Sequence, residues 1–218
     1  SGSGDKTIIT WDEEGNLVRR LSGHGRGVFG LQVVEYNVWS RSLDHTIRVW
    51  DENGKCLKIL EGHTGAVYTL LVVNRKHWTR VYSASEDEKV IVWDSEGKLL
   101  SKCVDHRKPV YCLADIDGGV WSGSDDTRVN VWDYDGELAR TLAHHDSPVS
   151  RIAVCQDWVF TTDDSGTVVV CALDGRVQRR CVGHPDSVKC ILALKDAVWT
   201  GGDDTSIRVW DVHWSMEF

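Results

Sequence analysis

The chain has 218 residues, a mass of 24.5 kDa and a formal charge of −8 at neutral pH. This charge argues against a general affinity for nucleic acids or anionic membranes, because both require clustered positive charge. No stretch approaches the roughly 18 apolar residues of a membrane span, and the first residues lack the pattern of a secretory signal. We therefore expect an intracellular protein, in the cytoplasm or the nucleus.

The sequence contains seven cysteines, and none pairs with another in a C-x-x-C motif. They fall in segments that are typical of strands, where cysteine acts as a small buried apolar residue. An odd number without paired spacing indicates free thiols in a reducing compartment rather than disulfides or metal ligands.

One segment recurs along the whole chain. It is best preserved at residues 122–133, S-G-S-D-D-T-R-V-N-V-W-D, and copies begin at Ser1, Ser40, Ser83 and Thr200, with a degenerate copy at Thr161. The Trp that ends each copy recurs in steps of 39 or 43 residues, with Cys171 in one Trp position. A fixed period of about 40 residues indicates stacked supersecondary units rather than one irregular domain.

Each repeat predicts four strands. An apolar stretch such as 67–73 or 188–194 is typical of a first strand that is buried on both faces. A tight turn leads to a second strand, as at 120–122 or 198–200, and a polar turn leads to a third strand that ends at Trp-Asp. A fourth strand, as at 56–60 or 137–142, follows a glycine turn that recurs with the period. The turn glycines are Gly15, Gly54, Gly97, Gly136 and Gly175.

Long cations concentrate on the predicted fourth strands. We interpret them as protection of an exposed sheet edge against pairing with another chain, the alternative being a basic band for nucleic acid. They are Arg19, Arg20, Lys58, Lys102, Arg140, Arg179 and Arg180.

One connection, residues 74–80, is four residues longer than its counterparts and contains Arg75-Lys-His-Trp78. It is either a contact point or simple length variation in an exposed loop.

Each repeat has a His before its first strand, usually preceded by Gly, and ends its third strand with Trp-Asp. This pattern resembles the WD-repeat family of β-propellers. The resemblance implies an all-β fold of four-stranded antiparallel blades, with four complete and two partial blades of a larger six- or seven-bladed ring. The expected blades are about 23–61, 62–104, 105–143 and 144–182, with partial blades at 1–22 and 183–218.

The two ends of the chain do not match a closed ring. In the last repeat, Trp214 stands where other turns have Gly. We expect missing sequence of a parent protein, or another copy of the chain, to complete the ring. The alternative is an open or swapped arrangement.

Four repeats each offer a His, a Ser or Thr, an Asp and a Trp. Such residues resemble a hydrolase triad, but four equivalent sets and the absence of a G-x-S-x-G motif argue against catalysis. The family resemblance implies instead a buried hydrogen-bonded chain within each blade. The sets are His24, Ser40, Asp44, Trp50; His63, Ser83, Asp87, Trp93; His106, Ser122, Asp126, Trp132; and His184, Thr200, Asp204, Trp210.

The repeat at 144–182 departs from this pattern. It keeps His145 and Thr161 but has Ser165 in the Asp position and Cys171 in the Trp position. We expect that the same chain cannot form there and that this blade is the softest. A metal pair at His144-His145 or a reactive Cys171 has no supporting ligand spacing, and the sequence indicates neither a metal nor a cofactor.

The resemblance implies that partners bind at the end of the blades that carries the Gly-His and Asp loops, which we call the top. The residues five positions after each His would surround this top end. The residues just before the Asp positions would also point there, and they are largely acidic. Together they suit a peptide or loop with basic and apolar residues. The expected contact residues are Phe29, Tyr68, Tyr111, Lys189, Glu86, Asp125, Asp164 and Asp203.

These features predict a non-catalytic scaffold for protein–protein interaction. The first alternative is a substrate-recognition module of a larger enzyme assembly, such as a ubiquitin ligase, kinase or phosphatase complex. Catalysis by the chain itself and binding of nucleic acid or phosphoinositide are further alternatives.

Overall fold

The computed structural model describes residues 1–211, which form strands and loops and contain no helix. None of these residues belongs to a helix with the length and hydrophobicity of a membrane span. The chain divides into two compact units, residues 1–105 and 106–218. Trp214 and the end of the predicted last blade lie outside the described residues.

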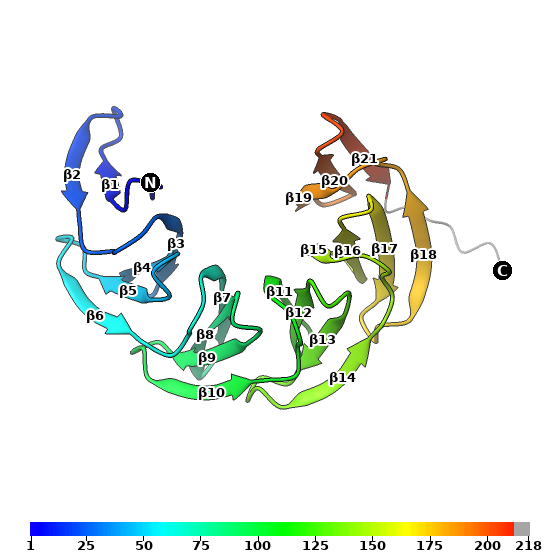
Figure 1. Cartoon of the computed structure of the whole chain (residues 1–218), viewed down its shortest axis with the longest axis horizontal. Helices are drawn as coiled ribbons and strands as arrows, with labels where there is room; N and C mark the ends of the chain where they lie inside the picture. The colour runs from blue at the N-terminus through cyan, green and yellow to red at the C-terminus, as the bar shows by residue number, and fades with distance from the viewer. Residues whose placement is uncertain (212–218) are drawn as a thin grey trace. The chain divides into compact units, whose positions relative to one another are not determined.

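The first unit contains three antiparallel sheets (Figure 1). The first has two strands, β1 (Ile8–Trp11) and β2 (Leu17–Leu21). The second has the order β3 (Val28–Val34), β4 (Asn37–Ser42), β5 (Ile47–Trp50) and β6 (Cys56–Leu60). The third has the order β7 (Val67–Arg75), β8 (Trp78–Ser85), β9 (Val90–Asp94) and β10 (Leu99–Cys103).

The second unit also contains three antiparallel sheets. Their strands are β11 (Val110–Ile116), β12 (Gly119–Ser124), β13 (Val129–Trp132) and β14 (Leu138–Leu142); β15 (Val149–Cys155), β16 (Trp158–Asp163), β17 (Thr167–Ala172) and β18 (Val177–Val182); and β19 (Val188–Ala193), β20 (Ala197–Gly202) and β21 (Ile207–Asp211). Within each sheet, every strand pairs with the strands that directly precede or follow it in the sequence. The prediction of an all-β fold built from four-stranded antiparallel sheets is confirmed; among the described residues, the first sheet has two strands and the last has three.

The turn between the third and fourth strands shows why Asp follows Trp in most repeats. In the second sheet, Asp51 accepts a hydrogen bond from the Lys55 backbone N–H at its side-chain Oδ1 (2.8 Å) and one from the Gly54 N–H at its carbonyl (3.0 Å). Gly54 has a φ of 77°, a conformation that favours glycine. The Trp-Asp motif therefore ends one strand and starts the hairpin to the next.

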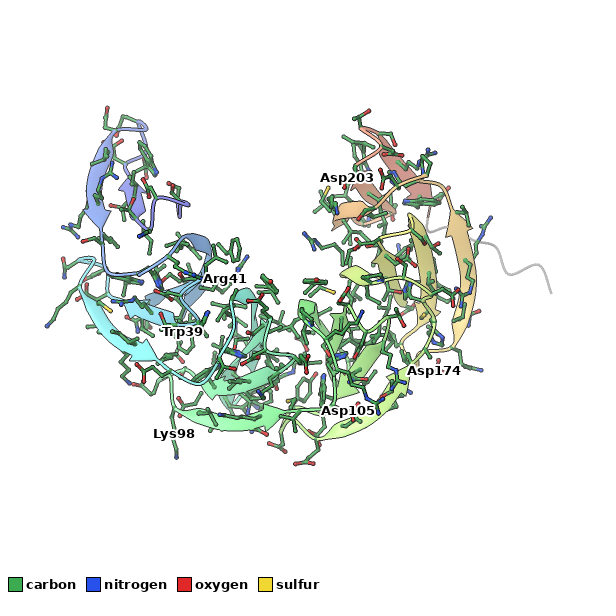
Figure 2. The ribbon with its side chains drawn as sticks, viewed as in Figure 1. Trp39, Arg41, Lys98, Asp105, Asp174 and Asp203 are labelled. Carbon is green, nitrogen blue, oxygen red and sulfur yellow. The ribbon has the colours of Figure 1, made fainter. Side chains whose placement is uncertain are left out.

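The cores of both units lie between successive sheets rather than inside any one of them. In the first unit, Trp39 and Ile47 of one sheet share a cluster with Val67 and Trp93 of the next. Trp39 is fully buried on β4 (Figure 2). Equivalent clusters join the sheets of the second unit. Because the third-strand and second-strand side chains that face a neighbouring sheet are large and apolar, the hydrophobic effect holds the sheets in sequence order.

The fourth strands also make polar contacts with the following sheet. Lys58 Nζ donates to the Glu96 carbonyl (2.5 Å), and the Arg140 guanidinium donates to the Leu173 carbonyl (3.2 Å). Both carbonyls lie in the turn between the third and fourth strands of the next sheet. These two cations therefore join neighbouring sheets, a role beyond the edge protection that we infer from the sequence.

Leu60 and Leu57, both on β6, provide a matched test of the packing between sheets. Leu60 is 6% exposed and lies against the next sheet, where a Cβ atom at Gly97 would come within 2.7 Å of Leu60 Cδ2, whereas Leu57 is 46% exposed. Leu60→Ala should lower the free energy of unfolding by about 2–5 kcal/mol, and Leu57→Ala by about 0.5 kcal/mol or less. Urea denaturation measures both, and equal losses would contradict this packing.

Candidate functional site

A continuous chain of hydrogen bonds runs through the second sheet. His24 Nδ1 lies 2.7 Å from Asp44 Oδ2, and His24 Nε2 lies 2.7 Å from Ser40 Oγ. The Trp50 indole N–H donates to the same Ser40 oxygen at 2.8 Å. His24 and Ser40 are buried, so each of their polar groups has a partner inside the blade.

The same chain recurs in three other sheets, with the donor–acceptor distances between 2.7 and 3.0 Å. The sets are His63, Ser83, Asp87, Trp93; His106, Ser122, Asp126, Trp132; and His184, Thr200, Asp204, Trp210.

The tautomer of His24 follows from its partner, because the pKa of Asp44 is lowered and an ionised carboxylate can only accept a hydrogen bond. With the imidazole proton on Nδ1, His24 donates to Asp44 and accepts from the Ser40 hydroxyl, whose oxygen in turn accepts from Trp50. Burial lowers the pKa of His24, and the hydrogen bond with Asp44 offsets only part of that effect. His24 is therefore neutral at physiological pH, with every donor matched to an acceptor.

The Asp carboxylate joins two loops. Burial alone would raise the pKa of Asp87, but hydrogen bonds from His63 and from the backbone N–H groups of Thr64 and Lys89 lower it to about 2. Thr64 lies in the Gly-His loop, and Lys89 lies in the loop between the second and third strands. An ionised Asp87 therefore holds together the two loops that form the top of this blade.

The repeat at 144–182 forms its buried chain in a different way from the other repeats, as the sequence predicts, but it keeps more of the chain than the sequence indicates. In the repeat at 144–182, His145 Nδ1 lies 2.7 Å from Asp163 Oδ2, and Nε2 lies 2.7 Å from Thr161 Oγ1. Asp163, two residues after Thr161, replaces the expected carboxylate, and Ser165 donates to its Oδ1 at 2.6 Å. The Asp–His–Thr part of the chain is therefore complete, and only the indole is missing because Cys171 stands in the Trp position.

The triad-like residues have no access to a substrate in this structure. Ser40, Ser83 and Ser122 have no exposed surface, and Thr200 is 1% exposed. Burial raises the pKa of the Cys171 thiol to about 11, which keeps it protonated and poorly nucleophilic. His144 Nε2 lies 2.9 Å from the Gly175 carbonyl, and His145 belongs to the buried chain, so these two residues do not form a metal pair.

The predicted top-face residues at the first strands share a backbone feature that sequence reasoning did not anticipate. Each lies at an irregularity in the pairing of the first and second strands, where the residue has no paired residue on the second strand. A β-bulge of this kind redirects a side chain away from the regular sheet. The bulged residues are Phe29, Tyr68, Tyr111, Ser150 and Lys189.

In the first unit, the bulges bring two predicted residues together. The ring centroids of Phe29 and Tyr68 lie 5.9 Å apart, and Phe29 is 48% exposed. Burial and the negative charge of Glu86 raise the pKa of Tyr68, and Glu86 Oε2 accepts a hydrogen bond from the Ala66 N–H (3.2 Å). Phe29, Tyr68 and Glu86 thus form one aromatic-acidic patch, which we call the aromatic patch.

In the second unit, lysines neutralise part of the predicted acidic surface. Lys189 Nζ lies 3.2 Å from Asp203 Oδ2 and 4.0 Å from Asp164 Oδ1, and Lys108 Nζ lies 3.4 Å from Asp125 Oδ2. Asp203 is in the loop between β20 and β21 (Figure 2). A basic ligand at this surface has to displace these lysines or share the Asp carboxylates with them. Tyr111 belongs to this unit, whereas the aromatic patch belongs to the first.

Ser83→Ala tests whether the buried chain stabilises the fold. The substitution leaves His63 Nε2 and the Trp93 indole N–H without their shared partner, so the free energy of unfolding should fall by about 1–3 kcal/mol for each unpaired group. The partly exposed Ser101 of the same sheet is the control. Thermal or urea denaturation of both variants gives the comparison, and a loss for Ser83→Ala no larger than that for Ser101→Ala would refute the role.

Three comparisons place the chain among known proteins. Residues 15–51, 54–94 and 175–211, together more than half of the sequence, match the family described as WD domain, G-beta repeat. Residues 76–171 match the IP5P C-F beta-propeller family. No curated protein matches the sequence. The crystal structure of the computationally designed Ika8 protein is similar, with 31% identity and a TM-score of 0.86 over 97% of this chain and 67% of that chain. The chain belongs to the WD-repeat family of β-propellers.

Proposed function

We propose that this chain is a non-catalytic scaffold that binds peptide or loop segments of other proteins at the top ends of its blades. The observation that carries the proposal is the bulge at the start of every complete first strand, which redirects one side chain per blade. In the first unit this places Phe29 against Tyr68 while leaving nearly half of Phe29 exposed. Aromatic side chains of this kind are enriched among residues that dominate binding energy.

The ligand that best suits the aromatic patch has an apolar side chain next to a basic one. Phe29 and Tyr68 offer apolar contact area with few rotatable bonds. Glu86 adds a carboxylate beside them, close enough to raise the pKa of Tyr68. In the second unit, Asp164 and Asp203 share the single Lys189, which leaves excess negative charge for a basic partner.

The same surface would serve a substrate-recognition module in a larger enzyme assembly, such as a ubiquitin ligase, kinase or phosphatase complex. In that case the ligand is the substrate of a partner enzyme. Additional domains in the parent protein, or co-purification with a catalytic subunit, would distinguish this alternative from a simple scaffold.

A peptide selected by phage display against the purified chain tests the proposed surface. Phe29→Ala and Tyr68→Ala should each weaken its affinity by about tenfold or more, as expected for aromatic hot spots. Tyr36→Ala is the control, because Tyr36 is 94% exposed in the turn between the first and second strands, at the opposite end of the same sheet. Isothermal titration calorimetry gives the affinities. Unchanged binding by both top-face variants would overturn the proposal.

We also propose that a further blade, from additional sequence or from another copy, covers the sheet β19–β21. Trp39 and Trp121 occupy equivalent register positions and are at most 1% exposed, whereas Trp199 is 42% exposed and its neighbour Val209 is 58% exposed. The 218-residue chain alone should therefore self-associate with rising concentration, and Trp199→Glu should reduce this association. Light scattering that finds a monomer at every concentration would contradict this.

A further inference from the structure

Two of the cations on β2 stand directly before an exposed serine. The sequence Arg19-Arg20-Leu21-Ser22 connects β2 to the Gly-His loop of the second sheet. Among all serines and threonines of the chain, Ser22 alone has arginine both two and three positions before it. Serine kinases with an acidic substrate cleft select this spacing, because their carboxylates pair with the two guanidinium groups.

The position of Ser22 differs from repeat to repeat. It lies two residues before the His of the buried chain, and the same position holds Glu61 in the next repeat. One repeat therefore already carries a negative charge at this place. Ser22 is the only hydroxyl among the five equivalent residues, the others being Glu61, Val104, Ala143 and Val182.

The arginines before Ser22 are accessible to another protein. Arg19, Arg20 and Ser22 are all exposed. Arg20 Nη1 lies 3.5 Å from Asp5 Oδ2 and 3.3 Å from Thr7 Oγ1. Because the side chains of Arg20 and Asp5 are both 53% exposed, their ion pair is solvated and contributes little, so a carboxylate of a kinase can replace Asp5.

The strand before Ser22 has an open edge. β2 pairs with β1 alone, in a sheet that has two strands among the described residues. Residues 19–22 are therefore presented as an extended segment. Leu21 is 8% exposed, but separation of β2 from a single neighbouring strand exposes it, and such local opening needs less free energy than unfolding of the whole chain.

A guanidinium group lies beside Ser22 without an anionic partner among the described residues. A Cβ atom at Gly23, the residue directly after Ser22, would come within 2.6 Å of Arg48 Nη1. Arg48 Nη1 makes a 4.0 Å contact with Cys56 Sγ, which is a weak acceptor, and the buried Nε of Arg48 has no hydrogen-bond partner. Arg48 is therefore placed to pair with an anion on Ser22.

We propose that Ser22 is a phosphorylation site for a serine kinase that recognises Arg19 and Arg20, and that the resulting phosphate pairs with Arg48. In the transfer, the Ser22 hydroxyl oxygen attacks the γ-phosphorus of ATP and the bond from this phosphorus to the β–γ bridging oxygen breaks. ADP leaves, and the hydroxyl proton passes to a carboxylate of the kinase.

The phosphate changes how the Gly-His loop is held. Phosphoserine brings three strong acceptor oxygens and close to two negative charges, and a guanidinium group can bind phosphate with two parallel hydrogen bonds. The pair of phosphoserine and Arg48 connects this loop to β5, so the modification stabilises the second sheet. The site is separate from the aromatic patch, and the two proposals can fail independently.

The modification is tested on the folded 218-residue chain with ATP and the catalytic subunit of cyclic-AMP-dependent protein kinase. Mass spectrometry should find one added phosphoryl group, on Ser22. Ser22→Ala should abolish the modification, and Arg19→Gln, Arg20→Gln should slow it by about tenfold or more, because the kinase loses both charge pairs. Arg179→Gln, Arg180→Gln, the matched pair at the same spacing in another repeat, should leave the rate unchanged. Modification only at other residues, or only of urea-unfolded chain, would overturn the proposal.

Phosphorus NMR of the phosphorylated chain tests the pairing with Arg48. Because a guanidinium favours the dianion, the second pKa of the phosphoserine should lie below its ordinary value of about 6, and phosphorylation should raise the unfolding temperature. Arg48→Gln should reverse both effects, whereas Arg208→Gln, at the equivalent position of the last sheet, should reverse neither. A phosphate pKa that is equal in the parent chain and in Arg48→Gln would contradict the pairing.

Two further variants keep these results interpretable. Arg48→Lys keeps the positive charge in case the glutamine disturbs folding, and it should retain a lowered phosphate pKa. Phe29→Ala should be phosphorylated at the rate of the parent chain, which separates this site from the proposed top-face function. A phosphate pKa in Arg48→Lys that returns to its ordinary value would contradict the pairing with a cation at this position.

Discussion

The buried chain from Asp through His to Ser or Thr is the interaction on which each blade depends. It connects the loop that enters a blade to the loop between the second and third strands, and it ends on the Trp indole of the third strand in all but one complete blade. Asp87, whose pKa is lowered to about 2, stays ionised at any physiological pH and so remains a hydrogen-bond acceptor for both loops. Residues that look like a hydrolase triad are thereby committed to structure, because their hydroxyl groups are buried and already hydrogen-bonded.

Once the loops are held, the rest of the architecture follows from packing and strand register. Apolar side chains such as Trp39 fill the space between successive sheets, and cations of the fourth strands bond to turn carbonyls of the next sheet. The bulge at the start of each first strand then redirects one residue per blade without disturbing this core. The bulged residues differ from blade to blade: Phe29, Tyr68, Tyr111 and Lys189 are at least partly exposed, whereas Ser150 is buried.

The repeat itself made most of the fold predictable. A recurring His, Ser, Asp and Trp at constant spacing predicts the strands and the turns, and the resemblance to the WD-repeat family implies the four regular hydrogen-bonded chains. At 144–182 the spacing does not reveal how much of the chain survives, because Asp163 supplies the carboxylate from a position two residues earlier than the Asp of the other repeats. The pairing of Lys189 with Asp164 and Asp203 was not predictable, because it depends on the proximity of two blades rather than on spacing within one. The bulges were also missed, since register irregularities leave no clear pattern in a single sequence.

The central claim is that the buried histidines are fixed hydrogen-bond relays, donating from Nδ1 to Asp and accepting at Nε2 from Ser or Thr. The most direct test is long-range proton–nitrogen NMR correlation of the imidazole rings in ¹⁵N-labelled protein at neutral pH. The account predicts the neutral ring with its proton on Nδ1 for His24, and the same proton position for the other four relays, His63, His106, His145 and His184. Rings that carry the proton on Nε2 instead would contradict it, because Nδ1 could then no longer donate to the carboxylate.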